Sequence, residues 1–240
     1  MIEVRDVSKS FGRFEALHGV SFSARDGEIT GLIGPNGAGK TTTLRVLYTV
    51  LKPDTGSATI DGFDTTSQRR EVQRRIGVLP DNRGLYPRLT AREHIRYYGR
   101  LHGLSGAHLE QRIDALVRQL GMEDIADRRT KGFSKGQTMK VALARALVHE
   151  PHNVMFDEPT NGLDIASSRA VRDLVLGIRD AGRCVLFCSH IMSEVEALCD
   201  RIVVIAHGRV VADGTPAELR HAVGRADLEE VFLETVEAGS

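Results

Sequence analysis

The chain has 240 residues, a length typical of one large α/β domain, so two independently folded domains are not expected. Hydrophobic residues make up 41% and charged residues 27%, and 32 basic residues balance 32 acidic ones, as in an ordinary globular protein. This balance argues against a nucleic-acid-binding protein. The apolar runs are far shorter than the roughly 18–20 residues that a membrane span needs, and the first residues do not resemble a secretion signal. We therefore expect a cytosolic protein.

Cysteine placement gives no sign of a metal site. The three cysteines, Cys184, Cys188 and Cys199, form neither a CxxC pair nor a cluster with histidines at metal-ligand spacing. An odd number of cysteines in a chain of cytosolic type favours free thiols, which are commonly buried. We expect three reduced, packed thiols.

Two kinds of apolar pattern predict two kinds of β structure. Near the start of the chain, short strand-like segments, one of them clearly alternating, predict an antiparallel layer formed by 2–5, 20–23 and 57–60. Later runs are almost continuously apolar, as in parallel strands that are covered on both faces. These runs are 28–33, 76–79, 154–156, 184–187 and 202–205. The fold class expected is therefore α/β with a mostly parallel sheet.

The strand pattern stops between Thr90 and Glu150, where amphipathic helical patterns replace it. We expect a helical lobe inserted at about 85–151. Further along, His207 and Gly208 separate two strand-like segments, which predicts a hairpin. The expected domain covers 1–222.

The last residues, 223–240, contain the acidic sequence LEEVFLETVE. This pattern predicts a peripheral helical tail after the domain.

A glycine-rich loop carries the strongest functional signal. Residues 34–42 read GPNGAGKTT, match the phosphate-loop pattern GxxxxGK[ST], and lie between an apolar run and a predicted helix at 40–51. In such loops backbone N–H groups face phosphate oxygens, Lys40 reaches the β- and γ-phosphates, and the Thr41 hydroxyl binds Mg²⁺. The order of the glycines excludes the GxGxxG dinucleotide motif. The predicted nucleotide-binding residues of the loop are Gly34, Pro35, Asn36, Gly37, Ala38, Gly39, Lys40, Thr41 and Thr42.

Two adjacent acids, Asp157 and Glu158, follow the apolar run 154–156. This places them at the carboxyl edge of the sheet, where α/β proteins bind ligands. Because neighbouring residues at a strand end point in different directions, Asp157 is predicted to bind Mg²⁺ and Glu158 to accept a proton from attacking water. The alternative is an acidic strand end that only meets solvent.

A second helix start also offers an anion site. The sequence FSKGQ at 133–137 precedes a predicted helix at 138–149, so a hydroxyl, a backbone amide and a cation meet at a helix N-terminus. Taken alone, Ser134 would be an ordinary N-cap. Two anion sites in one chain need an explanation.

Residues 2–222 resemble the ATP-binding subunit of an ABC transporter. Residues 34–42 are similar to the family's Walker A loop, 133–137 to its signature, 154–159 to Walker B and 161–164 to its D-loop.

Two single residues extend the resemblance. His190 matches the family's switch histidine, and Phe11 lies where the family places an aromatic that stacks on adenine. Without the other motifs, His190 would be an ordinary strand-end histidine and Phe11 a core aromatic.

The resemblance implies a P-loop NTPase of the RecA type that hydrolyses ATP with Mg²⁺. Two cassettes, identical or different, would meet head to tail, so that the signature of one covers the nucleotide of the other. ATP would close this pair and hydrolysis would open it, driving a permease that holds the chain at the inner face of the membrane. The implied residues are Lys40, Glu158 and His190 for catalysis; Ser134, Lys135, Gly136 and Gln137 for contacts across the pair; Asp164 for linking the two sites; and Thr41, Asp81 and Asp157 for the metal.

Four positions depart from the family pattern: Asp81, Lys135, Phe133 in place of leucine, and Phe11, which keeps the ring of the commoner tyrosine and lacks only its hydroxyl. Asp81 stands where the Q-loop usually has a glutamine that binds Mg²⁺ and responds to the permease. Aspartate also offers an oxygen ligand, so we expect metal binding to persist. Lys135 stands where the signature commonly has glycine, and a cation near a triphosphate is favourable.

Substrate and competing functions remain open at this level. Segments 79–101 and 133–151 are similar to cassettes assigned to sodium extrusion and related efflux, but membrane subunits mainly choose the substrate. One alternative is a soluble ABC-type ATPase that acts on ribosomes or DNA, although such proteins carry two cassettes or a long coiled coil. A P-loop kinase is another, but it leaves 133–137 unexplained.

Overall fold

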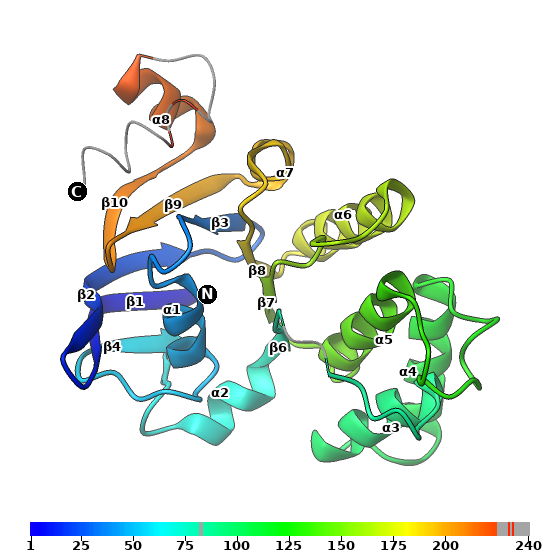
Figure 1. Cartoon of the computed structure of the whole chain (residues 1–240). Coiled ribbons are helices and arrows are strands. Elements are labelled where there is room, and N and C mark those ends of the chain that lie inside the picture. Colours follow the sequence, from blue (N-terminus) through cyan, green and yellow to red (C-terminus); the bar gives the residue numbers. More distant parts are fainter. Residues whose placement is uncertain (82–83, 225–229, 231, 233–240) are drawn as a thin grey trace.

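The computed structural model describes residues 1–81 and 84–224 together with Glu230 and Phe232. Two sheets lie against each other and a group of helices projects from one side (Figure 1). The smaller sheet is antiparallel, has the order β2-β1-β4-β5, and consists of β1 (Ile2–Phe11), β2 (Phe14–Ala24), β4 (Thr55–Ile60) and β5 (Phe63–Asp64). This sheet contains all three segments that were predicted to form an antiparallel layer.

The larger sheet has the order β10-β9-β3-β8-β7-β6 and is parallel except at its β10 edge. Each of the five apolar runs forms one of its strands, which confirms the predicted α/β class. The hairpin predicted at His207 and Gly208 joins its last two strands, and both turn residues have positive φ. The strands are β3 (Ile29–Ile33), β6 (Ile76–Leu79), β7 (Asn153–Asp157), β8 (Cys184–Cys188), β9 (Arg201–Ala206) and β10 (Arg209–Gly214).

Alternate residues of the parallel strands feed two separate cores. In β8, Val185 and Phe187 pack among the helices, whereas Leu186 packs toward the antiparallel sheet. The second core also holds Leu44 of α1 (Lys40–Leu47), which lies between the sheets. Because both faces are covered, β3, β7 and β8 are buried along their whole length. Cys184, Cys188 and Cys199 are free and buried as predicted, and burial raises the pKa of the Cys184 thiol to about 12.

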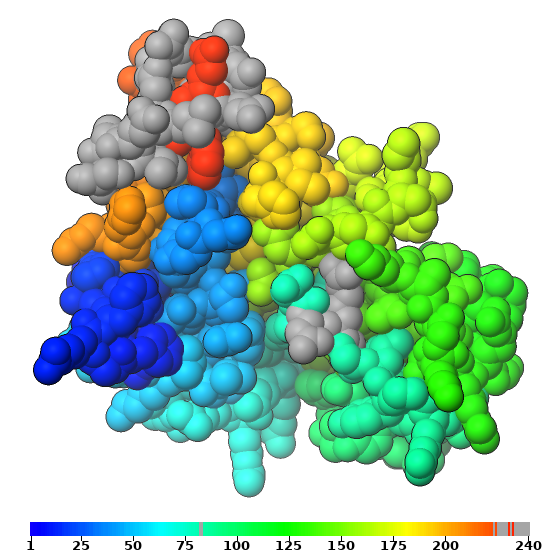
Figure 2. All heavy atoms as spheres, viewed as in Figure 1, coloured from blue at the N-terminus to red at the C-terminus, as the bar shows by residue number. Residues whose placement is uncertain are grey.

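The predicted helical lobe is inserted between β6 and β7 and forms a distinct mass beside the sheets (Figure 2). It contains α3 (Ala91–Leu101), α4 (Gly106–Gln119) and α5 (Lys135–Leu147). The remaining helices of the described residues are α2 (Arg69–Arg75), α6 (Ile165–Asp180), α7 (Met192–Leu198) and α8 (Pro216–Val223). Most of the predicted tail at 223–240 lies outside the described residues.

Three predicted helix boundaries were wrong, one of them the end of α5, which lies at Leu147 rather than at 149. α5 begins at Lys135 rather than at 138, because Ser134 Oγ accepts a hydrogen bond from the Gln137 N–H and the Gln137 side chain accepts one from the Ser134 N–H. α1 ends at Leu47 rather than at 51, because Thr49 has a φ of 67° and the next two N–H groups turn back to the Arg45 carbonyl.

Candidate functional site

A polar cavity of about 430 Å³ lies at the carboxyl ends of the central strands. It is lined by Phe14, Ala16, Asn36, Gly37, Ala38, Gly39, Lys40, Thr41, Thr42, Asp81, Asp157, Glu158, Asn161 and His190. Residues predicted from the phosphate loop, the two adjacent acids, the Q-loop segment and the switch histidine are thus brought together.

The loop between β3 and α1 has the shape of a phosphate cradle. Gly37 and Gly39 have φ values of 82° and 110°, which only glycine adopts readily. A Cβ on Gly34 would lie 2.1 Å from the Ile205 carbonyl oxygen, so the loop also needs glycine for its close approach to β9. Lys40 Nζ donates to the Gly34 and Pro35 carbonyl oxygens at 2.5 and 3.0 Å. The ammonium is therefore held inside the loop, where a phosphate chain would lie.

Three carboxyl groups converge on the opposite wall of the cavity. Burial and then the charges of Asp81 and Glu158 raise the pKa of Asp157 to about 6, while the Asp81 N–H donates to the Asp157 carboxylate. Mutual repulsion of this kind is relieved by a divalent cation, and oxygen donors are the ligands that Mg²⁺ prefers. The donor set, with the Thr41 hydroxyl on the same cavity, therefore fits a bound Mg²⁺.

Glu158 and His190 form a direct pair. The backbone of Glu158 has a φ of 50°, and its N–H donates to the Cys188 carbonyl of the neighbouring strand at 3.0 Å. His190 Nδ1 lies 2.8 Å from Glu158 Oε2. The Glu158 carboxylate thus has the His190 imidazole as a partner on the cavity that Asp157 also lines, and the separate roles expected for the two acids stay a prediction.

The aromatic residue on the cavity is Phe14 rather than Phe11. Phe14 and Ala16 alternate along β2 and both line the cavity, whereas Phe11 lies across the hairpin from Phe14 with the Lys9 ammonium 5.8 Å from its ring centre. Phe14 was not among the predicted residues, and the adenine contact expected of Phe11 stays a prediction. The i, i+2 spacing of Phe14 and Ala16 was the available signal.

The signature residues do not reach the cavity of their own chain. Ser134, Lys135, Gly136 and Gln137 lie at the start of α5, in the lobe, and none lines the cavity. Asp164 is also outside it and caps α6, accepting hydrogen bonds from the Ser167 N–H and Oγ at 2.8 and 3.0 Å.

Comparison with known proteins agrees with this geometry. A family model described as ABC transporter matches residues 17–161. This chain belongs to the ABC transporter family. It is 43% identical to the ABC transporter ATP-binding protein NatA of Bacillus subtilis over all of this chain and 99% of that protein. It is also 39% identical to the daunorubicin/doxorubicin resistance ATP-binding protein DrrA of Streptomyces peucetius, over 93% of this chain and 68% of that one.

Solved structures show the same fold. An ATP-binding subunit of an ABC transporter, 32% identical, superposes with a TM-score of 0.91 over 98% of this chain and 99% of that chain. An ATP-binding cassette in a dimeric, post-hydrolysis state with ADP and Pi, 26% identical, gives 0.81 over 90% and 98%. This chain is an ATP-binding subunit that hydrolyses ATP to drive transport. None of the helices in the described part of the chain is long and apolar enough to cross a bilayer.

Proposed function

We propose that this chain energises an exporter by hydrolysing Mg²⁺-ATP at composite sites between two cassettes. The observation that supports this proposal is that one chain does not bring all of its functional segments to the same cavity. The phosphate loop and the Glu158–His190 pair share a cavity, while the signature segment 133–137 lies outside it. A second cassette, identical or different, would supply the missing wall with its own signature segment.

Within the cavity, each residue has a distinct task in this proposal. Thr41, Asp81 and Asp157 would hold Mg²⁺, which offsets phosphate charge when it is bound. Lys40 binds the terminal phosphates. Glu158 accepts a proton from the attacking water, and His190 orients the Glu158 carboxylate through the 2.8 Å contact.

The partner's α5 would close the site. Ser134 Oγ, the Gly136 N–H and the positive end of α5 offer donors to phosphate oxygens, and Gln137 fixes Ser134 through the capping box. ATP then belongs to the interface, so binding favours the closed pair and hydrolysis releases it.

Export is the transport direction that the relatives favour. Drug resistance proteins and a Nod factor export protein are among the similar chains, at 34 to 39% identity. We infer the direction from them and leave the substrate to the permease.

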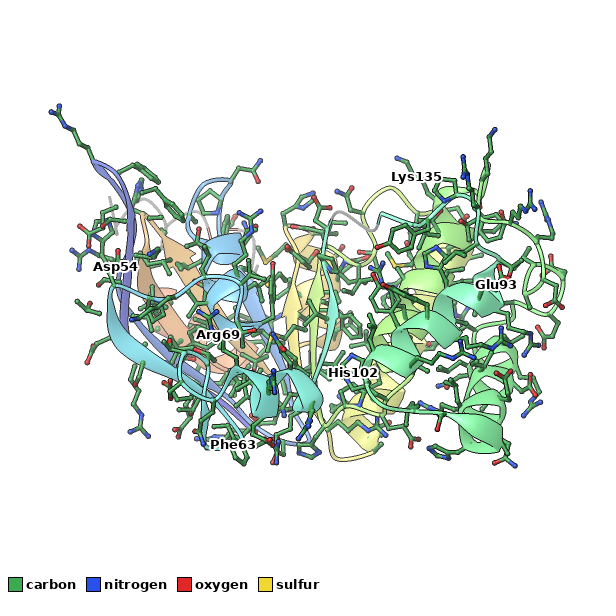
Figure 3. All side chains as sticks on the ribbon, turned by 90° about the horizontal axis from the view of Figure 1, so that it is seen from below. Asp54, Phe63, Arg69, Glu93, His102 and Lys135 are labelled. Carbon is green, nitrogen blue, oxygen red and sulfur yellow. The ribbon has the colours of Figure 1, made fainter. Side chains whose placement is uncertain are left out.

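A second groove, larger than the nucleotide cavity, is a candidate docking site for the permease. A groove of about 770 Å³ lies between α2, β6 and the lobe, where Figure 3 shows His102 at the boundary between the two masses. Pro80 lines this groove and the next residue, Asp81, lines the nucleotide cavity. A protein segment in the groove would therefore touch the loop that reaches the metal site.

The charge of the groove indicates an acidic segment. Arg70 and Arg145 line it, and the buried Arg145 guanidinium makes weak contacts with the Gly84 carbonyl and the Tyr98 hydroxyl, at 3.3 and 3.5 Å. Burial lowers the pKa of His149 to about 4, so the positive charge comes from the arginines. We propose that a permease docks here and keeps the chain at the inner face of the membrane.

Co-expression with a candidate permease and affinity capture from detergent-solubilised membranes test the docking. Arg70→Glu should reduce co-purification and permease-stimulated ATPase at least about tenfold, while the ATPase of the isolated chain stays unchanged. Arg118→Glu, at an exposed position of α4 outside the groove, is the matched control. Equal capture of both variants would overturn docking in this groove.

A further inference from the structure

The signature segment and the D-loop of one chain meet at the side chain of Lys135. Lys135, the first residue of α5, lies over Gly162, so that a Cβ on Gly162 would be 2.8 Å from Lys135 Nζ and 3.4 Å from its Cδ. Gly162 has a φ of 71°. Figure 3 shows Lys135 at the edge of the lobe, beside the loop that leaves the core. The long side chain thus covers a bare stretch of D-loop backbone.

A second contact lies directly beside the first. A Cβ on Gly136 would be 2.9 Å from Ser167 Oγ, and this hydroxyl donates to Asp164 Oδ2 at 3.0 Å. The first turn of α5 therefore lies against the capped start of α6. We call the Lys135–Gly162 and Gly136–Ser167 contacts together the α5–α6 bridge.

Apolar side chains of α5 and α6 pack together behind the bridge, beside a cavity. The cavity has a volume of about 500 Å³ and is lined by Met139 and Leu143 of α5 and by Val171 and Leu174 of α6. The bridge therefore adds a contact between the start of α5 and the D-loop to the apolar packing of the two helices.

The D-loop end of the bridge leads to the catalytic acid. The Asn161 N–H donates to the Glu158 carbonyl at 3.3 Å, and the Leu163 N–H donates to the Thr160 carbonyl at 3.1 Å. These hydrogen bonds make 158–164 a compact series of turns, so a shift at Gly162 reaches the backbone of Glu158.

We propose that Lys135 is a positioning residue for ATP hydrolysis, whose side chain covers Gly162 and makes the signature segment and the D-loop of one chain move as a unit. This inference rests on the proposed composite site. A glycine at position 135, common in related signatures, would leave Gly162 uncovered. In this proposal the packing of the Lys135 side chain on Gly162 matters more for hydrolysis than its positive charge does.

Steady-state ATPase of the full chain with its partner cassette tests this role. Lys135→Ala should lower kcat about three- to tenfold and leave the KM for ATP within about twofold, because the phosphate loop is untouched. Lys135→Met, with an uncharged side chain of similar reach, should recover most of the lost kcat. If Met is as poor as Ala while Arg restores activity, Lys135 acts through its charge and the positioning role is wrong.

A double-mutant cycle with Gly162→Ala gives a second readout. The new methyl group displaces Lys135, so adding Lys135→Ala should cost little more than Gly162→Ala alone. Multiplicative losses would show independent roles and overturn the bridge. Gly182→Ala, at a φ of 77° with no atom within 4 Å of its added Cβ, controls for left-handed strain and should keep kcat. If the wild type hydrolyses ATP and Lys135→Ala has the same kcat, only the role of Lys135 is wrong. If the wild type does not hydrolyse ATP, the proposed function itself is wrong.

Discussion

The imidazole of His190 and the carboxylate of Glu158 are joined at 2.8 Å, between Nδ1 and Oε2, across the ends of the adjacent strands β7 and β8. The histidine side chain is 56% exposed and that of the glutamate is 15% exposed. Glu158 is therefore largely buried, whereas its partner His190 is exposed enough to contact a nucleotide or a second cassette. A change in the contacts of His190 would reorient the acid without moving the strand.

Glu158→Gln should keep ATP affinity and slow turnover at least about a hundredfold, the scale for losing a positioned acid–base group. The phosphate loop is unchanged and only proton acceptance is lost. Size-exclusion chromatography with ATP should show more dimer than for the wild type, because hydrolysis no longer opens the pair. Normal steady-state hydrolysis in this variant would remove Glu158 from the mechanism.

His190→Ala should lower kcat about tenfold or more, because the carboxylate of Glu158 loses its orienting partner. Since the two residues act as a pair, the Glu158→Gln/His190→Ala double variant should be scarcely slower than Glu158→Gln alone. Single-turnover hydrolysis measures both. Fully multiplicative losses would mean that His190 works independently of Glu158.

Much of this site could be predicted from short sequence patterns, because each pattern reflects how a few neighbouring residues fold. The apolar runs before Gly34 and Asp157 reveal buried parallel strands, and parallel strands bring their carboxyl ends to one edge. Contacts between distant segments were less accessible. The position of Lys135 over Gly162 does not follow from periodicity, because it depends on how separate elements pack.

Phe14→Ala should weaken ATP binding about tenfold, within the roughly 1–3 kcal/mol that stacking of a base on an aromatic ring contributes. Phe11→Ala should change it by no more than about twofold, as for most surface substitutions, since Phe11 does not line the cavity. Fluorescent-nucleotide titration compares the two. A larger loss in Phe11→Ala would restore the family-based assignment of the adenine contact.

Ser134→Arg chains mixed with Lys40→Ala chains should regain activity that neither variant has alone. Ser134 and Lys40 lie in different places within one chain, so each mixed dimer contains one intact composite site if the signature acts across the interface. The mixture is predicted to reach up to about a quarter of wild-type ATPase from random pairing of the chains. No gain in activity, with mixed dimers shown by differently tagged subunits, would contradict the trans arrangement.

Asp81, which replaces the usual glutamine of the Q-loop, lies where it can contact a bound metal ion. It lines the cavity with Asp157, its backbone N–H donates to the Asp157 carboxylate, and its charge contributes to the raised pKa of that group. Two carboxylates this close repel each other and also repel a γ-phosphate. With a dication between them the sign reverses, because at comparable distances the attraction to a double charge exceeds the repulsion between single charges.

Asp81→Ala should therefore raise the Mg²⁺ concentration for half-maximal hydrolysis several-fold, which corresponds to about 1 kcal/mol, the scale of one pair of unit charges about 4 Å apart in bulk water. Asp81→Gln, which restores an oxygen donor without the charge, should retain most activity of the isolated chain in detergent. The competing role is coupling, because Pro80 beside it lines the arginine-bearing groove. Mg²⁺ titration of the isolated chain separates the two roles. An unchanged Mg²⁺ midpoint in Asp81→Ala, with ATPase stimulation lost only when the permease is present, would assign Asp81 to coupling and exclude it from the metal site.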